Sequence, residues 1–323
     1  MDISPELKNV IENRAQKLKP KEMMKISETI TKRYSEESGK GGHLVRTDNE
    51  ALVYSIVRMP ATFGAVSKAL EYALENTDFQ PESLIDAGAG TGAASWACET
   101  ACNVNNIVCL ERENAMMNFG KSLMAESESS LTNALWVKAD IVSDKIPYKA
   151  DLVIASYVLN ELSEEQRKKT LLKLWDSAEK MLLIVEPGTP EAFRQLKWAR
   201  GFMLENGAYI AAPCPHTKEC RLKDDDWCHF TARISRSKLH KLIKGGEVPY
   251  EDEKFSFMAF SKTECHNSGM RILRHPVTEK GSITLKVCSD DENKVIKIRK
   301  KDGALFKTAR KAECGDLITI REK

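Results

Sequence analysis

Five short apolar stretches, separated by segments of helical character, constrain the fold of this chain more than any other feature of its sequence. The stretches cover residues 83–85, 107–110, 134–137, 151–155 and 181–185, with helical segments at 93–102, 114–126 and 163–179. Strands that alternate with helices form a parallel sheet, because each parallel connection has to cross over the sheet. The sequence therefore predicts an α/β, Rossmann-like sheet with a ligand at its carboxyl edge.

The first of these strands leads into the glycine-rich turn DAGAGTG at residues 86–92. Its glycines are Gly88, Gly90 and Gly92. Glycine lets a ligand approach the backbone closely, and the start of the following helix favours electron-rich groups. The turn is therefore a candidate binding site for a nucleotide cofactor.

Acidic residues follow the second and third strands. Glu111 ends the second strand, nineteen residues after Gly92, where a carboxylate can accept both hydroxyls of a ribose. Asp140 follows the third strand, where it can meet the amine of an adenine. These two side chains extend the candidate cofactor site along the sheet edge.

Two cofactors compete for this turn. NAD is one, because Gly88, Gly90 and Ala93 satisfy the pattern GxGxxA. S-adenosylmethionine (SAM) is favoured over NAD by the acid Asp86, which is positioned to hold the turn or the methionine amine. The glycines at every second position and the acid after the third strand also favour SAM.

A charged segment at residues 213–230, PCPHTKECRLKDDDWCHF, contains three cysteines and two histidines. They are Cys214, Cys220, Cys228, His216 and His229. Such a segment buries too little apolar surface to offset the entropy of ordering it, and thiolates that bind one inorganic centre would supply that free energy. Three unconnected thiols in a loop are the alternative. A metal or cluster site is favoured, because free cysteines prefer apolar surroundings.

Three cysteines leave a tetrahedral site one ligand short. The candidates for the fourth ligand are His216, His229, Cys265, Cys288 and Cys314. Cys288 is the first choice, because it ends a predicted strand at 283–287 that it could pin to the cysteine segment; Cys265 is the second. The spacing matches neither zinc ribbons nor ferredoxins, so zinc and an iron–sulfur cluster both stay open.

The chain is 323 residues long and 42% apolar, which fits one large domain or a domain with additions. Amphipathic helices are expected over residues 5–35 and further helix over 50–74, with a break at Pro60. Arg58 lies at that break, where its side chain can point into a cleft; a surface arginine near a helix end is the alternative. A linker is expected at 39–42 and a helix at 191–206. Short strands are expected at 255–260 and 283–320, with a turn at Asp302-Gly303. We divide the chain into a helical region (1–80), a SAM-binding core (81–210), a cysteine-rich insertion (211–254) and a β module (255–323).

The cysteine count and the hydropathy of the chain indicate its expected cellular compartment. The nine cysteines are an odd number, and the first residues lack the apolar stretch of a secretory signal. No stretch is long and apolar enough to cross a membrane. We therefore expect reduced thiols, a cytoplasmic location and a monomer.

The net charge is only +2, but basic residues are concentrated in two segments. Residues 294–311 hold eight basic side chains against the single acid Asp302, and residues 233–244 form a second basic run. Such segments attract phosphate backbones, although solvated strand faces have the same composition. The charge pattern therefore leaves both a nucleic-acid partner and a solvated strand face open.

Several motifs occur together in order. They are RMPAT at 58–62, the turn at 86–92, DLVIASYVLNEL at 151–162, VEPGTP at 185–190, APCPH at 212–216, WCHF at 227–230 and DEKFSF at 252–257. Over residues 50–320 the chain closely resembles the methyltransferase-like family associated with the mitochondrial small ribosomal subunit, which has bacterial members. The N-terminus without a targeting segment fits a bacterial or archaeal version.

The resemblance implies a SAM-dependent methyltransferase fold and a role in assembly of the small subunit or in translation. It also implies a 4Fe–4S cluster on Cys214, Cys220, Cys228 and Cys288. Arg221 departs from the family, which commonly has proline after the second cysteine, but the departure removes no ligand.

The catalytic residues are not evident. After the fourth strand the chain reads SYVLNE at 156–161, without the Asn-Pro-Pro-aromatic turn or the cysteine nucleophile of nucleobase methyltransferases. Asn160 and Glu161 are the candidates to orient or deprotonate an acceptor, and a helix start is the alternative for both. Three functions follow: an rRNA methyltransferase, a non-catalytic RNA-binding assembly factor, and a small-molecule methyltransferase with a zinc loop.

Overall fold

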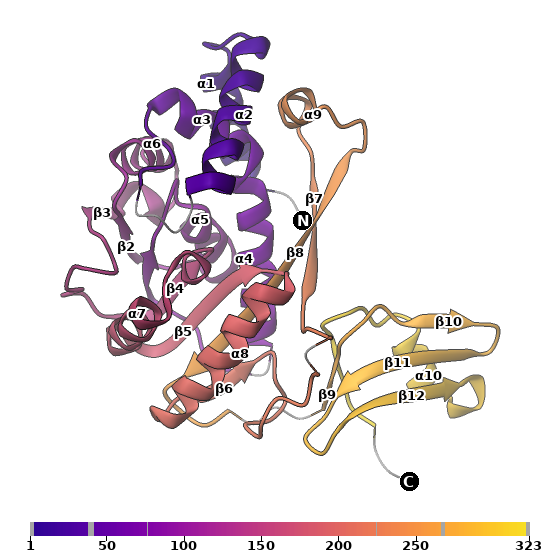
Figure 1. The fold of residues 1–323 in the computed structure, drawn as a ribbon. Helices are drawn as coiled ribbons and strands as arrows, with labels where there is room; N and C mark the ends of the chain where they lie inside the picture. Colours follow the sequence, from indigo (N-terminus) through magenta and orange to yellow (C-terminus); the bar gives the residue numbers. More distant parts are fainter. Residues whose placement is uncertain (1–2, 38–41, 76, 224, 266–268, 321–323) are drawn as a thin grey trace.

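The computed structural model describes residues 3–37, 42–75, 77–223, 225–265 and 269–320, and its centre is a sheet of eight strands in the order β3-β2-β1-β4-β5-β8-β6, with β7 paired to β8 (Figure 1). The strands are β1 (Ser83–Ala87), β2 (Asn106–Glu111), β3 (Leu135–Lys138), β4 (Ala150–Ser156), β5 (Ala178–Pro187), β6 (Tyr209–Ala212), β7 (Phe230–Ser235) and β8 (Tyr250–Ser261). β1 to β5 run parallel, and β8 is antiparallel to β5 and β6. The predicted Rossmann-like α/β sheet is confirmed.

Helices cover both faces of this sheet. The helices of the core are α5 (Ala93–Cys102), α6 (Asn114–Met124), α7 (Glu164–Ser177) and α8 (Pro190–Glu205). α5 and α6 pack on one face, where Leu84 of β1 is buried, and α7 and α8 pack on the other, where Ile85 is buried. Neighbouring residues of a strand point to opposite faces, so the continuous apolar run of β1 serves both cores.

The expected N-terminal helices are confirmed. They are α1 (Pro5–Ala15), α2 (Pro20–Glu37), α3 (Asp48–Val57) and α4 (Met59–Leu74). Pro60 lies in the first turn of α4, where its missing N–H costs no helical hydrogen bond, so the chain breaks at Arg58 before it. α3, α4 and part of α1 join the core on the α5–α6 face. The expected linker at 39–42 falls almost entirely outside the described residues.

A long antiparallel hairpin extends from the large sheet. Its tip carries α9 (Lys238–Lys244) between β7 and β8 (Figure 1). One end of β8 pairs with β7, and the other end lies between β5 and β6. The expected strand at 255–260 is therefore part of the large sheet, and the division that we drew at residue 255 falls inside β8.

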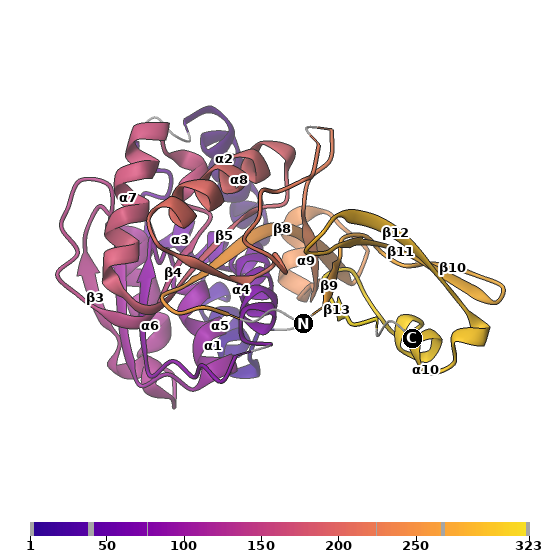
Figure 2. The same cartoon turned by 90° about the horizontal axis from the view of Figure 1, so that it is seen from below.

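A second, smaller sheet lies to one side of the first (Figure 2). Its strands are β9 (Met270–Ile272), β10 (Val277–Glu279), β11 (Ser282–Cys288), β12 (Asn293–Arg299) and β13 (Leu317–Ile318). The expectation of short strands over 283–320 is confirmed by β11, β12 and β13, but it was wrong at α10 (Ala304–Ala309), a helix that follows Gly303. Leu305, Phe306 and Ala309 recur at helical spacing and pack on the apolar face of this sheet.

The buried side chain of Arg271 joins the two sheets. Its Nε donates to the carbonyl oxygen of Pro213 at 2.9 Å, and its Nη1 donates to Glu75 at 3.0 Å and to the carbonyl oxygen of Gly315 at 2.6 Å. Only 1% of this residue is exposed, and a buried charge requires such partners. In the part of the chain that the structure describes, every helix is too short or too polar to cross a membrane.

Candidate functional site

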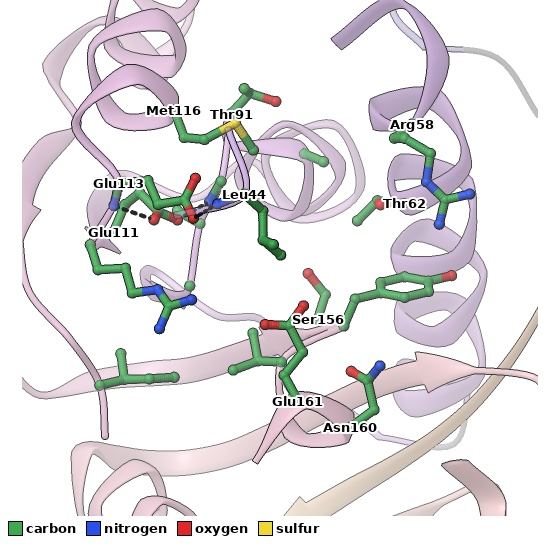
Figure 3. A pocket seen from close by; sticks show the side chains of 18 of the residues that line it. Leu44, Arg58, Thr62, Thr91, Glu111, Glu113, Met116, Ser156, Asn160 and Glu161 are labelled. Atoms are coloured by element: carbon green, nitrogen blue, oxygen red, sulfur yellow. Dashed lines mark hydrogen bonds between the residues drawn. The ribbon is translucent and has the colours of Figure 1, made fainter. Parts of the chain in front are cut away.

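A cavity of about 320 Å³ lies at the carboxyl edge of the parallel strands (Figure 3). The residues that follow β1, β2, β3 and β4 line it, among them Gly88, Gly90, Glu111, Asp140, Ser156 and Asn160. Parallel strands place their carboxyl ends on one edge, so residues far apart in the sequence share this cavity. Glu161 and Arg58 line the cavity as well, and Arg58 lies across it from Glu161 (Figure 3).

Glu111 fixes the glycine-rich turn. Its Oε2 accepts a hydrogen bond from the N–H of Gly90 at 2.7 Å, and its Oε1 accepts one from the N–H of Glu113 at 2.7 Å. Burial raises the pKa of Glu111 to about 7, against the effect of these two donors. Glu113 in turn accepts the N–H groups of Leu44 and Val45, at 2.9 and 3.0 Å, which ties the N-terminal region to the cavity.

Asp86 and Gly92 lie behind the cavity wall. Asp86 Oδ2 accepts the backbone N–H and the hydroxyl of Ser95, at 3.0 and 2.7 Å, and burial raises the pKa of this carboxyl to about 6. Gly92 has φ 89°, and a Cβ there would approach Met124 Cε to 2.4 Å. Neither residue lines the cavity. Their observed contacts build the turn that carries Gly88 and Gly90.

Asn160 and Glu161 belong to a short 3-10 helix, η2 (Leu159–Glu161), at the opposite side of the cavity. The buried carboxyl group of Glu186, at the end of β5, holds this helix. It accepts the backbone N–H groups of Val158, Leu159 and Asn160, at 3.2, 2.8 and 3.2 Å. Burial raises the pKa of Glu186 to about 8. Our reading of the sequence gave Glu186 no role, although an acid inside the apolar end of a strand was the available signal.

Stability is expected to fall as the pH rises from 6.5 to 8.5. Glu186 keeps its proton in the folded chain up to about pH 8, whereas an unfolded chain has lost it above the ordinary value of 4.5. The folded state then binds more protons, so the free energy of unfolding decreases by about 1.4 kcal/mol per pH unit below the folded pKa, or about 2 kcal/mol over this window. Urea unfolding at several pH values measures it.

The variant Glu186→Gln provides the control for this pH dependence. Its amide oxygen still accepts the N–H groups of Val158 and Leu159, which both bond Oε1, but the N–H of Asn160 loses its acceptor. We expect a loss of about 1–3 kcal/mol at pH 6.5 and a flatter pH profile. Burial of Glu111 and Asp86 also makes the stability fall with rising pH, but at lower pH than for Glu186. An equally steep profile in Glu186→Gln would therefore contradict the assignment of this pH dependence to Glu186.

Tyr157 adopts a left-handed backbone conformation directly after β4. Its φ is 59°, a conformation that costs a tyrosine on the order of 1 kcal/mol or more. Its N–H donates to Val185 O at 2.7 Å, and its hydroxyl donates to Glu253 of β8 at 2.8 Å. Backbone strain of this kind concentrates at functional sites. Tyr157, directly after the fourth strand, is thus fixed through both its backbone N–H and its side-chain hydroxyl.

The cysteines of the 213–230 segment border a second, mostly apolar cavity between α8 and the small sheet. Cys214, Cys220, Cys228 and Cys288 all line it. Burial raises the pKa of the Cys214 and Cys228 thiols, and that of Cys288 to about 12. His216 Nε2 lies 3.5 Å from Cys288 Sγ. Within the described ranges, no group of three His, Cys, Asp or Glu side chains is arranged to hold a metal ion.

The other candidates for a fourth ligand lie outside this cavity lining. Cys314 Sγ is 3.8 Å from the carbonyl oxygen of His229, and Cys265 Sγ is 3.6 Å from that of Thr263. Cys288 reaches the cavity because it ends β11, whose pairing with β9 places it beside Arg271.

Two buried guanidinium groups border the four-cysteine cavity. Arg271 is one; the other is Arg200 of α8, which is 4% exposed and donates to the carbonyl oxygens of His216 and Lys218. The Nε of Arg200 is buried and has no hydrogen-bond partner among the described residues. Four cysteine side chains next to buried positive charge have the chemistry that an anionic thiolate-bound group would require. Sequence reasoning missed both arginines, because their burial depends on distant segments.

Three of the basic residues in the two predicted phosphate-binding segments form ion pairs within the described chain. In 233–244, Arg233 binds Asp252 through two hydrogen bonds of 2.7 Å, and Arg236 binds Glu251 at 3.3 Å. In 294–311, Lys297 binds Glu279 at 2.8 Å. These acids reduce the positive charge available to a phosphate backbone.

Comparisons with known proteins extend this description. The chain is 26% identical over 297 residues to the human protein named "Ribosome assembly protein METTL17, mitochondrial", covering 85% of this chain and 63% of the relative. It is 23% identical over 333 residues to Rsm22-cox11 tandem protein 2 of Schizosaccharomyces pombe, covering 86% and 44%. Among solved structures, magnesium protoporphyrin IX methyltransferase of Synechocystis with bound SAH aligns with a TM-score of 0.43 and 13% identity, covering 73% of this chain and 99% of that one.

This chain thus spans less than two thirds of the length of these curated relatives. Their names are mitochondrial, which does not match the cytoplasmic location that we expected from the sequence. The family model described as "Mitochondrial small ribosomal subunit Rsm22" matches residues 48–319. That match takes in the strand-edge cavity, the four-cysteine cavity and the small sheet, and the chain belongs to this family.

Proposed function

We propose that this protein binds SAM and supports the assembly of the small ribosomal subunit, with a thiolate-bound 4Fe–4S cluster as a structural element. The membership of the Rsm22 family and the name of the human relative support the ribosomal part. The observation that carries the proposal is the cavity that collects Gly88, Gly90, Glu111 and Asp140 at one edge of a Rossmann-like sheet.

The chemistry of this cavity supports SAM as the ligand. Gly88 and Gly90 leave the backbone open to a ligand, and the carboxylate of Glu111 keeps lone pairs for the two ribose hydroxyls after accepting one N–H on each oxygen. Asp140 borders the same space and would meet the adenine amine. Asp86 and Gly92 would contribute by holding the turn.

The four-cysteine cavity supports a cluster that links distant parts of the chain. Cys214, Cys220 and Cys228 would hold it from the segment after β6, and Cys288 would hold it from the small sheet. The bound centre would supply folding free energy that a charged segment lacks. The same four thiols would also suit zinc, which stays the alternative.

Basic side chains that keep no acidic partner in the described structure would contact rRNA. Four such side chains are exposed, and no ion pair joins them to an acid in the part of the chain that the structure describes: Lys238 of α9, and Lys300, Lys301 and Lys307 in or near α10. Both basic segments would thereby contact rRNA. The cluster would fix the small sheet, which carries one segment, and the hairpin carries the other segment with α9. We propose a monomer for this state.

Methyl transfer to rRNA is the catalytic form of this proposal. Asn160 and Glu161 are the weak candidates to orient or deprotonate the acceptor, and transfer of a methyl group can proceed mainly through positioning. A second candidate is a non-catalytic assembly factor that retains SAM as a structural ligand. It is favoured by the sequence after β4, SYVLNE at 156–161, which contains neither the Asn-Pro-Pro-aromatic turn nor the cysteine nucleophile of nucleobase methyltransferases.

Transfer of tritium from labelled SAM to small-subunit rRNA separates the two candidates. The expected result is incorporation of label by the wild-type protein at a rate at least about 100-fold above that of Gly90→Arg, which blocks the cavity. Tight binding of SAM without any incorporation would reject the catalytic form and keep the assembly factor. A wild-type protein that binds neither SAM nor rRNA would contradict the proposed function as a whole.

A further inference from the structure

A third cavity lies beside the proposed SAM cavity, between the N-terminal helices and the tip of the long hairpin. Its volume is about 290 Å³, and its lining comes from α2, α3 and the residue after α3, with Lys244 from α9. We call it the hairpin cavity. Tyr34, Tyr54 and Arg58 line both the hairpin cavity and the SAM cavity. These three side chains therefore form the wall between the two.

The aromatic part of this wall suits a planar ring. Tyr34 and Tyr54 are stacked, with ring centroids 6.2 Å apart and an angle of 24° between the rings. Further lining residues are hydroxyl or apolar side chains: Ser27, Thr31, Ser35, Ile30, Val53 and Val57. Stacking on tyrosine binds any of the nucleobases, since every base has an aromatic face.

The charged part of the lining is positive. Arg58 and Lys244 are both exposed, and no ion pair joins either of them to an acid among the described residues. No acidic residue lines the hairpin cavity. Glu253 lies close enough to affect Arg58, but it accepts the hydroxyl of Tyr157. Two unpaired cations next to stacked rings select an anion that carries a planar ring.

We propose that the hairpin cavity binds one nucleotide of a single-stranded RNA segment. Its phosphate lies at Arg58 and Lys244, and its base lies against Tyr34 and Tyr54. This inference rests on the proposed function. The proposed RNA partner is the reason to assign the hairpin cavity to a nucleotide within a strand and not to a free nucleotide. The hairpin cavity thus holds a nucleotide next to the proposed SAM cavity, at the wall that the two cavities share.

Binding of a fluorescent single-stranded oligonucleotide by the intact chain tests this. Lys244→Gln is expected to weaken binding about five-fold and to reduce the slope of log Kd against log salt by about 0.7, the value for one phosphate contact on a single strand. Tyr34→Leu is expected to weaken it about ten-fold, as loss of one stacked base does. Unlabelled single strands are expected to compete, and duplex RNA and nucleoside monophosphates are expected to compete far less.

Matched controls are Lys21→Gln, an exposed lysine on α2, and Tyr209→Leu, a half-exposed tyrosine on β6; neither lines the hairpin cavity. Each is expected to change Kd less than two-fold. Equal effects in the test and control variants, or nucleoside monophosphates that compete as well as strands, would overturn the proposal. SAM affinity, measured calorimetrically on the same samples, reports separately on the proposed function, because Lys244 does not line the SAM cavity.

Discussion

Replacing Cys220 with serine is expected to remove the iron of the proposed 4Fe–4S site and to destabilise the whole chain. Cys220 borders the four-cysteine cavity, and the segment that carries it has few apolar residues of its own. A structural metal site supplies on the order of 10 kcal/mol of folding free energy, so loss of one ligand should cost about 5 kcal/mol, comparable to the stability of a typical domain. Iron content, the visible absorption of anaerobically purified protein and the melting temperature measure the loss.

The same measurements on Cys288→Ser and Cys265→Ser identify the fourth ligand. Cys288 lines the cavity with the other three cysteines, whereas Cys265 does not. Cys288→Ser should therefore behave like Cys220→Ser, and Cys265→Ser should keep its iron and its melting temperature. Bound zinc in place of iron, with the same response to these variants, would support the zinc alternative. Unchanged metal content in Cys220→Ser would reject any site at this cavity.

Replacing Gly90 with arginine is expected to weaken SAM binding by about 100-fold or more, roughly 3 kcal/mol. Gly90 lines the strand-edge cavity with φ 58°, and its N–H is held by Glu111. An arginine side chain would fill space that the ligand needs, because overfilled sites cannot relax without shifting the backbone. The left-handed conformation would add a folding cost of about 1–2 kcal/mol. Isothermal titration with SAM and urea unfolding separate the two effects.

Gly207→Arg provides the matched control. Gly207 has φ 79°, and a Cβ there would meet nothing within 4 Å. An arginine at residue 207 therefore imposes a backbone cost similar to that of an arginine at residue 90, and it adds the same charge at a site away from the cavity. SAM affinity should stay within about two-fold of the wild type, where a ten-fold change would correspond to about 1.4 kcal/mol of binding free energy. Equal losses of SAM affinity in both variants would show that strain, and not occupation of the cavity, causes the effect.

The central fold could be predicted from the sequence because its signals are local. Each of the first five strands is a short apolar run, and the positions of the turn residues at 86–92 follow from the strand that precedes them. Glu111 and Asp140 could be located for the same reason, since a residue that ends a parallel strand lies at the sheet edge whatever the rest of the chain does.

The remaining features depend on contacts between segments far apart in the sequence. Tyr34 meets Tyr54 only because α2 packs on α3, and Glu186 reaches the N–H groups after β4 only because β4 and β5 are neighbours. The sequence left two possibilities open for Asp86, to hold the turn or to hold the methionine amine. Its hydrogen bond with Ser95 corresponds to the first. α10 was missed because Lys307 and Thr308, between its apolar residues, also suit an exposed strand.

The contacts of Arg271 impose an order on the formation of the cysteine cavity during synthesis. Its guanidinium group meets carbonyl oxygens at Pro213 and Gly315 and the carboxylate of Glu75, so it joins segments made early, midway and late. Cys288 also comes late. The surroundings of the cysteine cavity are therefore complete only after translation has passed Gly315, so the proposed cluster site would form late in synthesis.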